Sequence, residues 1–246
     1  MDEQDDWLTL QSQPEEEILD VYIDLKSPHA YLSVRPSLEI ARDFKVMLNF
    51  MPYTLCYESL GLTKQIGPEK KREPASPAAD RKARMYYATA REHAALQSLP
   101  LKSPYRLLDS ELAHRVFLFA KEQNLEVAFT MCVYLQGWAS GWRNFELECD
   151  VDLKSACCQV GIDINGIDAY IAEKGEGQQR LIEISVRAET DGVVGVPHYV
   201  FNDRDKNRRV GLFGREHLAL IRGKYMEWGL ARRRDVVAHF SHTWPA

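Results

Sequence analysis

The sequence lacks a Cys-x-x-Cys pair and any zinc-ligand spacing, although it contains five cysteines. An odd number without these spacings argues against a disulfide scaffold and against a zinc site, and we expect no metal. A mutual disulfide of the vicinal pair would be strained within one helix, so we interpret both members as small buried side chains. The five are Cys56, Cys132, Cys149, Cys157 and Cys158.

An excess of positive charge is also missing, because 31 Lys and Arg stand against 36 Asp and Glu, for a net charge of -5. This leaves no global positive field for nucleic acid or an anionic membrane surface, and we expect neither partner. No apolar run approaches the roughly 18 residues that cross a bilayer. Residues 1–17 carry seven acids and no basic residue, the reverse of a signal peptide. We therefore expect a cytoplasmic protein with a small-molecule substrate.

The 246 residues are 45% hydrophobic and 27% charged, which is typical of a soluble globular chain. Residues 18–25 form an apolar, β-rich run that predicts a buried strand. Ser27 stands at the N-cap position of the next helix, and Pro28 stands at its first helical position, where a missing N–H costs nothing. Residues 46–52 predict a second strand, which completes a β-α-β unit.

A block of helices follows before strands return. Apolar residues at helical spacing predict helices over residues 81–97, 110–124, 126–140, 147–160, 167–173 and 178–190. Strand character returns over residues 193–201 and 210–213, ahead of a final helix over residues 214–229. A β-α-β unit, an all-helical insertion and a β-β-α unit together predict an α/β protein with a thioredoxin-like fold.

Four segments bring a resemblance to a known family. Their order and spacing resemble the motifs of the 2-hydroxychromene-2-carboxylate isomerases and the kappa-class glutathione transferases, members of the DsbA-like thioredoxin group. The segments are residues 24–32, Phe50-Met51-Pro52, residues 99–104, and Gly195-Val196-Pro197 with Phe213-Gly214. The resemblance covers roughly residues 18–225. It implies a thioredoxin-like domain over residues 18–60 and 176–230, a helical insertion over residues 61–175, and tails over residues 1–17 and 231–246.

The motif Ser27-Pro28-His29-Ala30 stands where dithiol oxidoreductases of this group carry Cys-Pro-His-Cys. Without either sulfur, thiol-disulfide exchange at this site is impossible, so a dithiol oxidoreductase is disfavoured. A helix N-terminus still favours an anion and lowers the pKa of a nearby thiol. The resemblance implies that glutathione, as cofactor, brings the thiol and that Ser27 donates its hydroxyl hydrogen to the sulfur. The alternative is that Ser27 is only an N-cap.

The resemblance assigns further residues to glutathione. A cis Val196–Pro197 bond would turn the Val196 N–H and C=O outward to pair with the cysteinyl part, although only about 5–6% of X-Pro bonds are cis in general. Glu216 would meet the α-amino group, or else is simply an acid in the first turn of a helix. Lys82 would meet a carboxylate of glutathione or substrate, or else is solvated surface. Gln65 stands where an asparagine is usual.

Other positions depart from the family pattern or have two interpretations. Thr89, Glu92, Arg215 and His217 replace the residues that are usual there. The chemistry could therefore be kept while the specificity for the second substrate has moved. His29 could tune the thiolate or relay a proton, or else has no acid-base role.

The remaining motifs are interpreted as structural. Four aromatic residues stand at helical spacings where such side chains usually fill a core, and we favour core packing over substrate stacking for Tyr86, Tyr87, Trp138 and Trp142. The basic runs at residues 70–72 and 232–234 are interpreted as solvated charge.

By resemblance, the chain is interpreted as a glutathione-dependent isomerase that forms a homodimer. In that family the thiolate would add to a carbon of an aromatic or conjugated keto acid, allow rotation about a bond that is no longer double, and then leave. Two alternatives stay open. One is a kappa-like glutathione transferase, which consumes glutathione, and the other is a non-catalytic binding protein with the thioredoxin fold.

Overall fold

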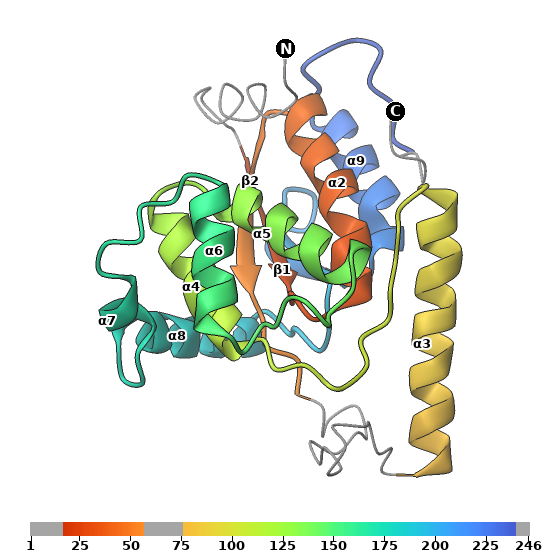
Figure 1. Cartoon of the computed structure of the whole chain (residues 1–246). Helices are drawn as coiled ribbons and strands as arrows, with labels where there is room; N and C mark the ends of the chain where they lie inside the picture. The colour runs from red at the N-terminus through yellow and green to blue at the C-terminus, as the bar shows by residue number, and fades with distance from the viewer. Residues whose placement is uncertain (1–16, 57–75, 240–246) are drawn as a thin grey trace.

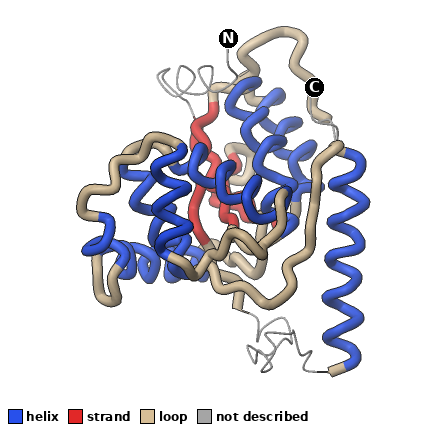
Figure 2. The backbone as a smooth tube through the Cα atoms, in the orientation of Figure 1, coloured by secondary structure: helices blue, strands red, loops and turns tan. Residues whose placement is uncertain are grey.

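The computed structural model describes residues 17–56 and 76–239, which build a four-stranded sheet with helices on both faces (Figure 1 and Figure 2). The strands are β1 (Glu17–Ile23), β2 (Val46–Pro52), β3 (His198–Asp203) and β4 (Arg208–Phe213). Their order is β2-β1-β3-β4, with β1 parallel to β2, and β3 antiparallel to β1 and β4. The expected α/β, thioredoxin-like fold is confirmed.

The helices fall into two groups around this sheet. They are α2 (Pro28–Asp43), α3 (Pro77–Leu96), α4 (Glu111–Glu122), α5 (Glu126–Tyr134), a π-helical turn (Leu135–Ala139), α6 (Asp150–Gln159), α7 (Ile167–Ile171), α8 (Glu176–Thr190), a 3-10 turn (Arg215–His217) and α9 (Leu218–Glu227). Helix α2 packs on β2, α3 and α9, whereas α4 and α8 pack on β2 and on each other. Figure 1 shows α3 at the edge of the molecule, beyond α2. No helix in the described part of the chain is long and apolar enough to cross a membrane.

Helix α2 continues through a proline, and this creates a tie to other elements. Pro36 has no N–H to give to the carbonyl of Leu32, four residues earlier. The Leu32 C=O instead accepts from Gln97 Nε2, at the end of α3, and from Arg215 Nη1, before α9, each at 3.4 Å. Two distant segments therefore form hydrogen bonds to α2 at the position where its own backbone hydrogen-bond pattern is interrupted.

The strand expected over residues 193–201 begins only at His198, so its predicted start was wrong. Gly192, with a φ of 73°, turns the chain after α8, and the Val193 N–H donates back to the Ala188 C=O at 2.9 Å. The residues that follow α8 thus belong to the helix end and a loop. One apolar run covers the loop and the strand alike, so apolar pattern alone does not separate them.

One large core runs through the sheet and the helical block. Trp138 and Trp142 are buried and pack edge to face with 5.2 Å between ring centroids. Tyr87 packs against Trp138 at 6.3 Å, so the core role expected of these three aromatic residues is confirmed. A second, small cluster joins α2 to α3 and consists of Leu32, Ala90 and Ala94.

Gly137, in the π-helical turn, has no room for a side chain. A Cβ there would overlap the ring of Trp142, which is buried and cannot move aside. We expect Gly137→Ala to lower the free energy of unfolding by about 1–3 kcal/mol. A Cβ at Gly223 in α9 would have the Ala238 Cβ as its nearest neighbour, at 3.9 Å. Gly223→Ala should therefore raise the free energy of unfolding by about 0.5–1 kcal/mol. Urea unfolding measures both, and effects of the same sign would contradict the packing argument.

Candidate active site

The strand register brings several predicted site segments to one end of the sheet. Ile23 pairs with Pro52, and Tyr22 pairs with His198. His198 in turn pairs with Phe213. The chain that leaves β1 therefore emerges beside the chain that enters β3, and close to the chain that leaves β4.

Ser27 follows β1 and caps α2 with its side chain. Its Oγ accepts the Ala30 N–H at 3.3 Å, Pro28 stands in the first turn, and Ser27 is 5% exposed. The N-cap prediction is confirmed. A hydroxyl also has one hydrogen to donate, and no residue within 17–56 or 76–239 accepts it. Because a helix N-terminus favours negative charge, Ser27 can cap α2 and also donate to an anionic ligand atom.

Asp24 fixes the turn that leads into Ser27. Its carboxylate accepts the Lys26 N–H at 3.0 Å and the Leu55 N–H at 2.8 Å. Its C=O accepts the Ser27 N–H at 2.9 Å. Burial alone would raise the pKa of Asp24, but the charge of Lys26 and the interactions with His114 and Ser110 outweigh burial and hold the pKa well below its usual value. Asp24 therefore stays ionised and sets the position of Ser27.

His114 of α4 supports the same turn from the helical block. Its Nε2 lies 3.3 Å from the Leu25 amide nitrogen and 3.3 Å from Asp24 Oδ1. Its Nδ1 lies 2.8 Å from Thr54 Oγ1. Sequence reasoning missed His114 and Thr54, because both are far from Asp24 along the chain and no short motif joins them. The local signal was Asp24 itself, an acid at the end of an apolar strand.

His29, in the first turn of α2, is a half-buried base. Burial lowers its pKa, and the charges of His93 and Arg215 lower it further. A hydrogen bond to the Tyr86 backbone and the charge of Glu216 act in the opposite direction. The His29 Nε2 is buried and has no hydrogen-bond partner in the described chain. Since a neutral imidazole accepts one proton, His29 can act as a base toward a ligand that reaches Nε2.

Lys82 is linked to His29 through Tyr86, one turn further along α3. The Lys82 ammonium lies 5.9 Å from the centroid of the Tyr86 ring, and that ring meets His29 edge on at 6.3 Å. Lys82 is exposed, so its charge is accessible to a ligand carboxylate. Tyr86 is 40% exposed, and its expected place in the core was wrong. Helix α3 packs mainly on α2.

The loop before β3 offers backbone groups to a ligand. The Val196–Pro197 bond is cis, as the resemblance implied. Within the described residues, neither the N–H nor the C=O of Val196 has a hydrogen-bond partner, although the residue is 5% exposed. Most buried backbone groups are paired, so this N–H and C=O are a place where an extended peptide can bind. A Cβ at Gly195 would come within 2.8 Å of the Phe213 ring, so a larger residue there would require this exposed ring to shift.

The segment before α9 carries one exposed and one buried charge. Glu216 is exposed, and its carboxylate lies so close to Gly214 that a Cβ there would collide with it. Arg215 is 4% exposed. Its Nη1 donates to the Leu32 C=O, and its Nη2 lies 3.3 Å from His93 Nδ1. This departure from the family pattern therefore ties the segment to α2 and α3.

Of the four other predicted residues, three lie in the described part of the chain. Gln65, proposed for glutathione, lies outside the described residues. Thr89 and Glu92 are exposed on α3. His217 is half-buried, with Nδ1 3.3 Å from the Gly214 carbonyl oxygen.

The cysteines of the described chain are free thiols. Cys157 is buried as expected, and burial raises its pKa to about 12. Cys158 is exposed, so its expected burial was wrong, because it points away from the core on the same helix. Residues 17–56 and 76–239 hold no group of three His, Cys, Asp or Glu side chains placed to bind a metal ion.

His198, directly after Pro197, gives the fold a dependence on pH. It is 4% exposed, and neither ring nitrogen has a hydrogen-bond partner among the described residues. Burial lowers its pKa. The unfolded chain therefore binds a proton that the folded chain resists, and the free energy of unfolding falls as the pH drops below about 6.5.

We expect His198→Leu to raise the free energy of unfolding by about 1 kcal/mol at neutral pH, because two unpaired polar atoms are removed. The variant should also lose less stability than the wild type between about pH 7 and about pH 5. Urea unfolding across this range measures both effects. His239→Leu, at an exposed position, is the control and should change neither. An unchanged pH profile in His198→Leu would refute the explanation.

Comparison with protein families finds the DSBA-like thioredoxin domain over residues 18–226. No curated protein matches the chain.

Solved structures share the fold at low sequence identity. A 2-hydroxychromene-2-carboxylate isomerase superposes with a TM-score of 0.66 and 16% identity, covering 86% of this chain and 96% of its own. A probable DsbA oxidoreductase from Streptomyces coelicolor superposes with a TM-score of 0.64 and 17% identity, covering 90% of this chain and 93% of its own. The cytosolic disulfide reductase DsbM from Pseudomonas aeruginosa, with GSH, superposes with a TM-score of 0.57 and 13% identity, covering 86% of this chain and 97% of its own. The group thus contains both an isomerase and oxidoreductases.

Proposed function

Because the chain belongs to the DSBA-like thioredoxin domain family, we propose that it is an enzyme that binds glutathione at the N-terminus of α2 and uses it in an isomerisation. The observation that carries this proposal is the replacement of both motif sulfurs. Ser27 and Ala30 stand where a dithiol pair would act, yet the Ser27 hydroxyl has a hydrogen to donate at a helix N-terminus. Such a site suits a thiol that arrives with a ligand.

The residues at this end of the sheet fit a glutathione molecule in chemical type. The unpaired N–H and C=O of Val196 match the backbone of a cysteinyl residue. The exposed carboxylate of Glu216 would hold an α-amino group, and the exposed ammonium of Lys82 a carboxylate. The Ser27 hydroxyl would then meet the sulfur between them.

Bound glutathione would supply a thiolate that adds to a carbon of a conjugated double bond. That bond is then no longer double and can rotate before the thiolate leaves. Ser27 would hold the negative charge on the sulfur by hydrogen bonding, with help from the α2 N-terminus. His29 would accept the thiol proton at Nε2 and return it when the cycle ends. The wall of α3 around Tyr86 would contact the second substrate, an aromatic or conjugated keto acid.

Calorimetric titration with glutathione and with S-methylglutathione tests the proposal. S-methylglutathione has the same peptide but cannot form a thiolate. We expect binding of glutathione that weakens on methylation, because only the free thiol can become the anion that Ser27 stabilises. Equal binding of both compounds would mean that the site does not recognise the thiol. Binding of neither would favour a non-catalytic binding protein.

A second measurement separates an isomerase from a kappa-like transferase. In a screen of conjugated keto acids, an isomerase regenerates glutathione, so its concentration stays constant while substrate disappears. A transferase consumes one glutathione for each product molecule. A homodimer in the cytoplasm remains part of the proposal, and light scattering of the purified protein measures the oligomeric state.

A further inference from the structure

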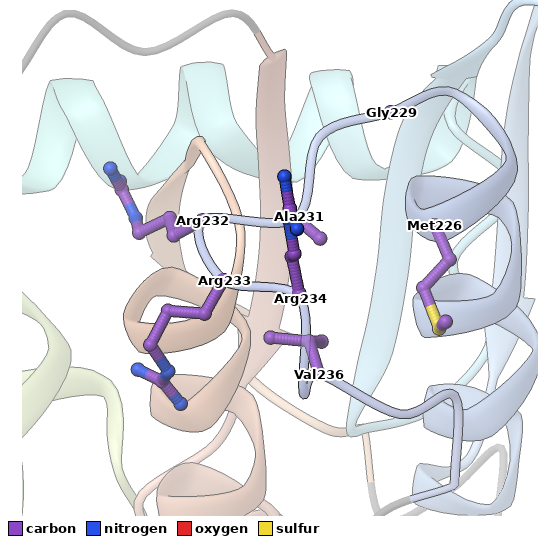
Figure 3. Close-up of a pocket in the computed structure, with 7 residues that line it drawn as sticks. All are labelled: Met226, Gly229, Ala231, Arg232, Arg233, Arg234 and Val236. Carbon is purple, nitrogen blue, oxygen red and sulfur yellow. The ribbon is translucent and has the colours of Figure 1, made fainter.

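An open groove lies at the end of the sheet where β1 and β2 begin, opposite the end that leads to Ser27. The chain after α9 folds back and leaves an open groove of about 370 Å³. Met226, Ala231 and Val236 give this groove an apolar part, and Figure 3 shows their side chains with those of three consecutive arginines. The arginines are Arg232, Arg233 and Arg234. We call this surface the C-terminal groove.

Arg232 is half-buried and held by the fold, so the expectation of solvated charge is wrong for this residue, whereas Arg233 is exposed and forms an ion pair. Arg232 Nε donates to the Ala41 C=O at 3.1 Å and to the Phe44 C=O at 2.9 Å. Arg233 Nη2 lies 3.3 Å from Asp43 Oδ1. In Figure 3 both side chains extend away from Met226.

The charge around the C-terminal groove is positive. One buried carboxylate, that of Asp43, is shared by three guanidinium groups, those of Arg42, Arg222 and Arg233. Arg233 also pairs with Asp235, with 3.3 Å between Nε and Oδ1, whereas Arg234 is exposed and forms no ion pair with any described residue. The groove therefore combines apolar side chains with cations that outnumber the nearby acids, a surface suited to an acidic segment that also has apolar residues.

The N-terminal strand enters the sheet close to this groove. Ala231 forms a β-bridge with Phe44, and Val46, two residues further on, pairs with Glu17. Two strand pairs of about 5 Å each and two residues of chain place Glu17 within about 17 Å of Ala231. Any segment attached to Glu17 therefore starts within about 17 Å of Ala231.

Residues 1–16 have the matching chemistry in their sequence and lie outside the described residues. They contain six acids and no basic residue, and the acids flank the apolar stretch Trp7-Leu8-Thr9-Leu10. We propose that residues 1–16 of the same chain bind in the C-terminal groove. The stretch from Trp7 to Leu10 would pack on Met226 and Val236, with the flanking acids facing the arginines.

The length of the segment permits this arrangement. The ten residues from Trp7 to Glu17 reach up to about 35 Å when extended. That exceeds the roughly 17 Å between Glu17 and Ala231. The linker is also short, so the entropy cost of closing it is small.

Fluorine NMR of the full chain labelled with 5-fluorotryptophan tests the proposal. The chain has five tryptophans, and Trp7→Phe identifies the resonance of Trp7. We expect this resonance to differ in position and to be broader than that of a free synthetic peptide of residues 1–16. Arg234→Glu should move it at least halfway to the free-peptide position, and about 1 M salt should act in the same direction.

A matched control removes an arginine elsewhere. Arg208 on β4 is exposed and has no ion pair with a described residue, so Arg208→Glu should leave the Trp7 resonance unchanged. Charge reversal at Asp5 and Asp6 to lysine should restore the docked position in the Arg234→Glu variant. The resonances of the buried Trp138 and Trp142 report in each sample that the fold is intact.

Two results would overturn the proposal. A wild-type Trp7 resonance at the free-peptide position would mean that the segment does not bind the groove. A displaced resonance that returns to this position on dilution would mean that the occupant is the segment of a second copy. Neither result depends on glutathione, so failure here leaves the proposed function untouched.

Discussion

Replacing Asp24 by alanine is expected to lower the free energy of unfolding by about 3–5 kcal/mol. The substitution would leave the buried ammonium of Lys26 without its carboxylate, which lies 3.5 Å away. It would also remove the acceptor of the Lys26 and Leu55 N–H groups. Asp24 is fully buried and Lys26 is nearly so, so water compensates little for the lost carboxylate.

The effect should depend on pH in a defined direction. The pKa of Asp24 in the folded chain is well below its usual value. Its stabilising contribution is therefore complete above the unfolded pKa of about 4 and is lost as the pH falls further toward the folded pKa. The difference between wild type and Asp24→Ala should be constant between about pH 5 and about pH 7 and should narrow below about pH 4.

Urea unfolding across this pH range measures the difference. Asp150→Ala is a suitable control, because Asp150 is an exposed acid that pairs with Lys154 one turn along α6. The control should unfold at nearly the same urea concentration as the wild type. A loss in Asp24→Ala no larger than in Asp150→Ala would refute the role given to the buried carboxylate.

Replacing Ser27 by alanine is expected to weaken glutathione binding by about 10- to 100-fold, if the Ser27 hydroxyl stabilises the thiolate. The reason is the loss of a hydrogen bond to a charged atom, which contributes about 1.5–3 kcal/mol. S-methylglutathione should bind the variant and the wild type equally. The variant should therefore lose the preference for the free thiol, and paired calorimetric titrations measure this directly.

The chain contains a matched control for the loss of a helix cap. Ser76 begins α3 just as Ser27 begins α2, with Oγ accepting the Ala79 N–H at 3.1 Å and a proline in the first turn. Ser76→Ala should cost about 1 kcal/mol of stability without changing glutathione binding. Ser27→Thr retains a hydroxyl and should keep the preference for the free thiol. An unchanged preference in Ser27→Ala would refute the role of Ser27.

The parts of the fold that the sequence predicted are those encoded by neighbouring residues. Ser27 and Pro28 indicate the start of α2, because an N-cap residue and the proline after it both act on the first turn of the helix. The strand at residues 46–52 was predicted with its observed limits, because a short apolar run ends there at Pro52. Local chemistry indicated that Ser27 would be a cap, whereas its role as a donor was implied only by the family resemblance.

The contacts that complete the candidate site are long-range, and local patterns do not reveal them. His114 reaches Leu25 across 89 positions of the chain, and Arg215 reaches Leu32 across 183. Tyr86 and Tyr87 are adjacent in one helix, yet only Tyr87 packs on the large core. The difference depends on how α3 lies against α2, which helical spacing alone does not determine.

The proline inside α2 also constrains how this sequence can change over generations. The Leu32 carbonyl is open to Gln97 and Arg215 only while residue 36 lacks an N–H. An alanine at position 36 would offer its own amide and compete with both side chains. Positions 36, 97 and 215 are therefore expected to covary among relatives, since drift at one of them removes the selection that maintains the other two.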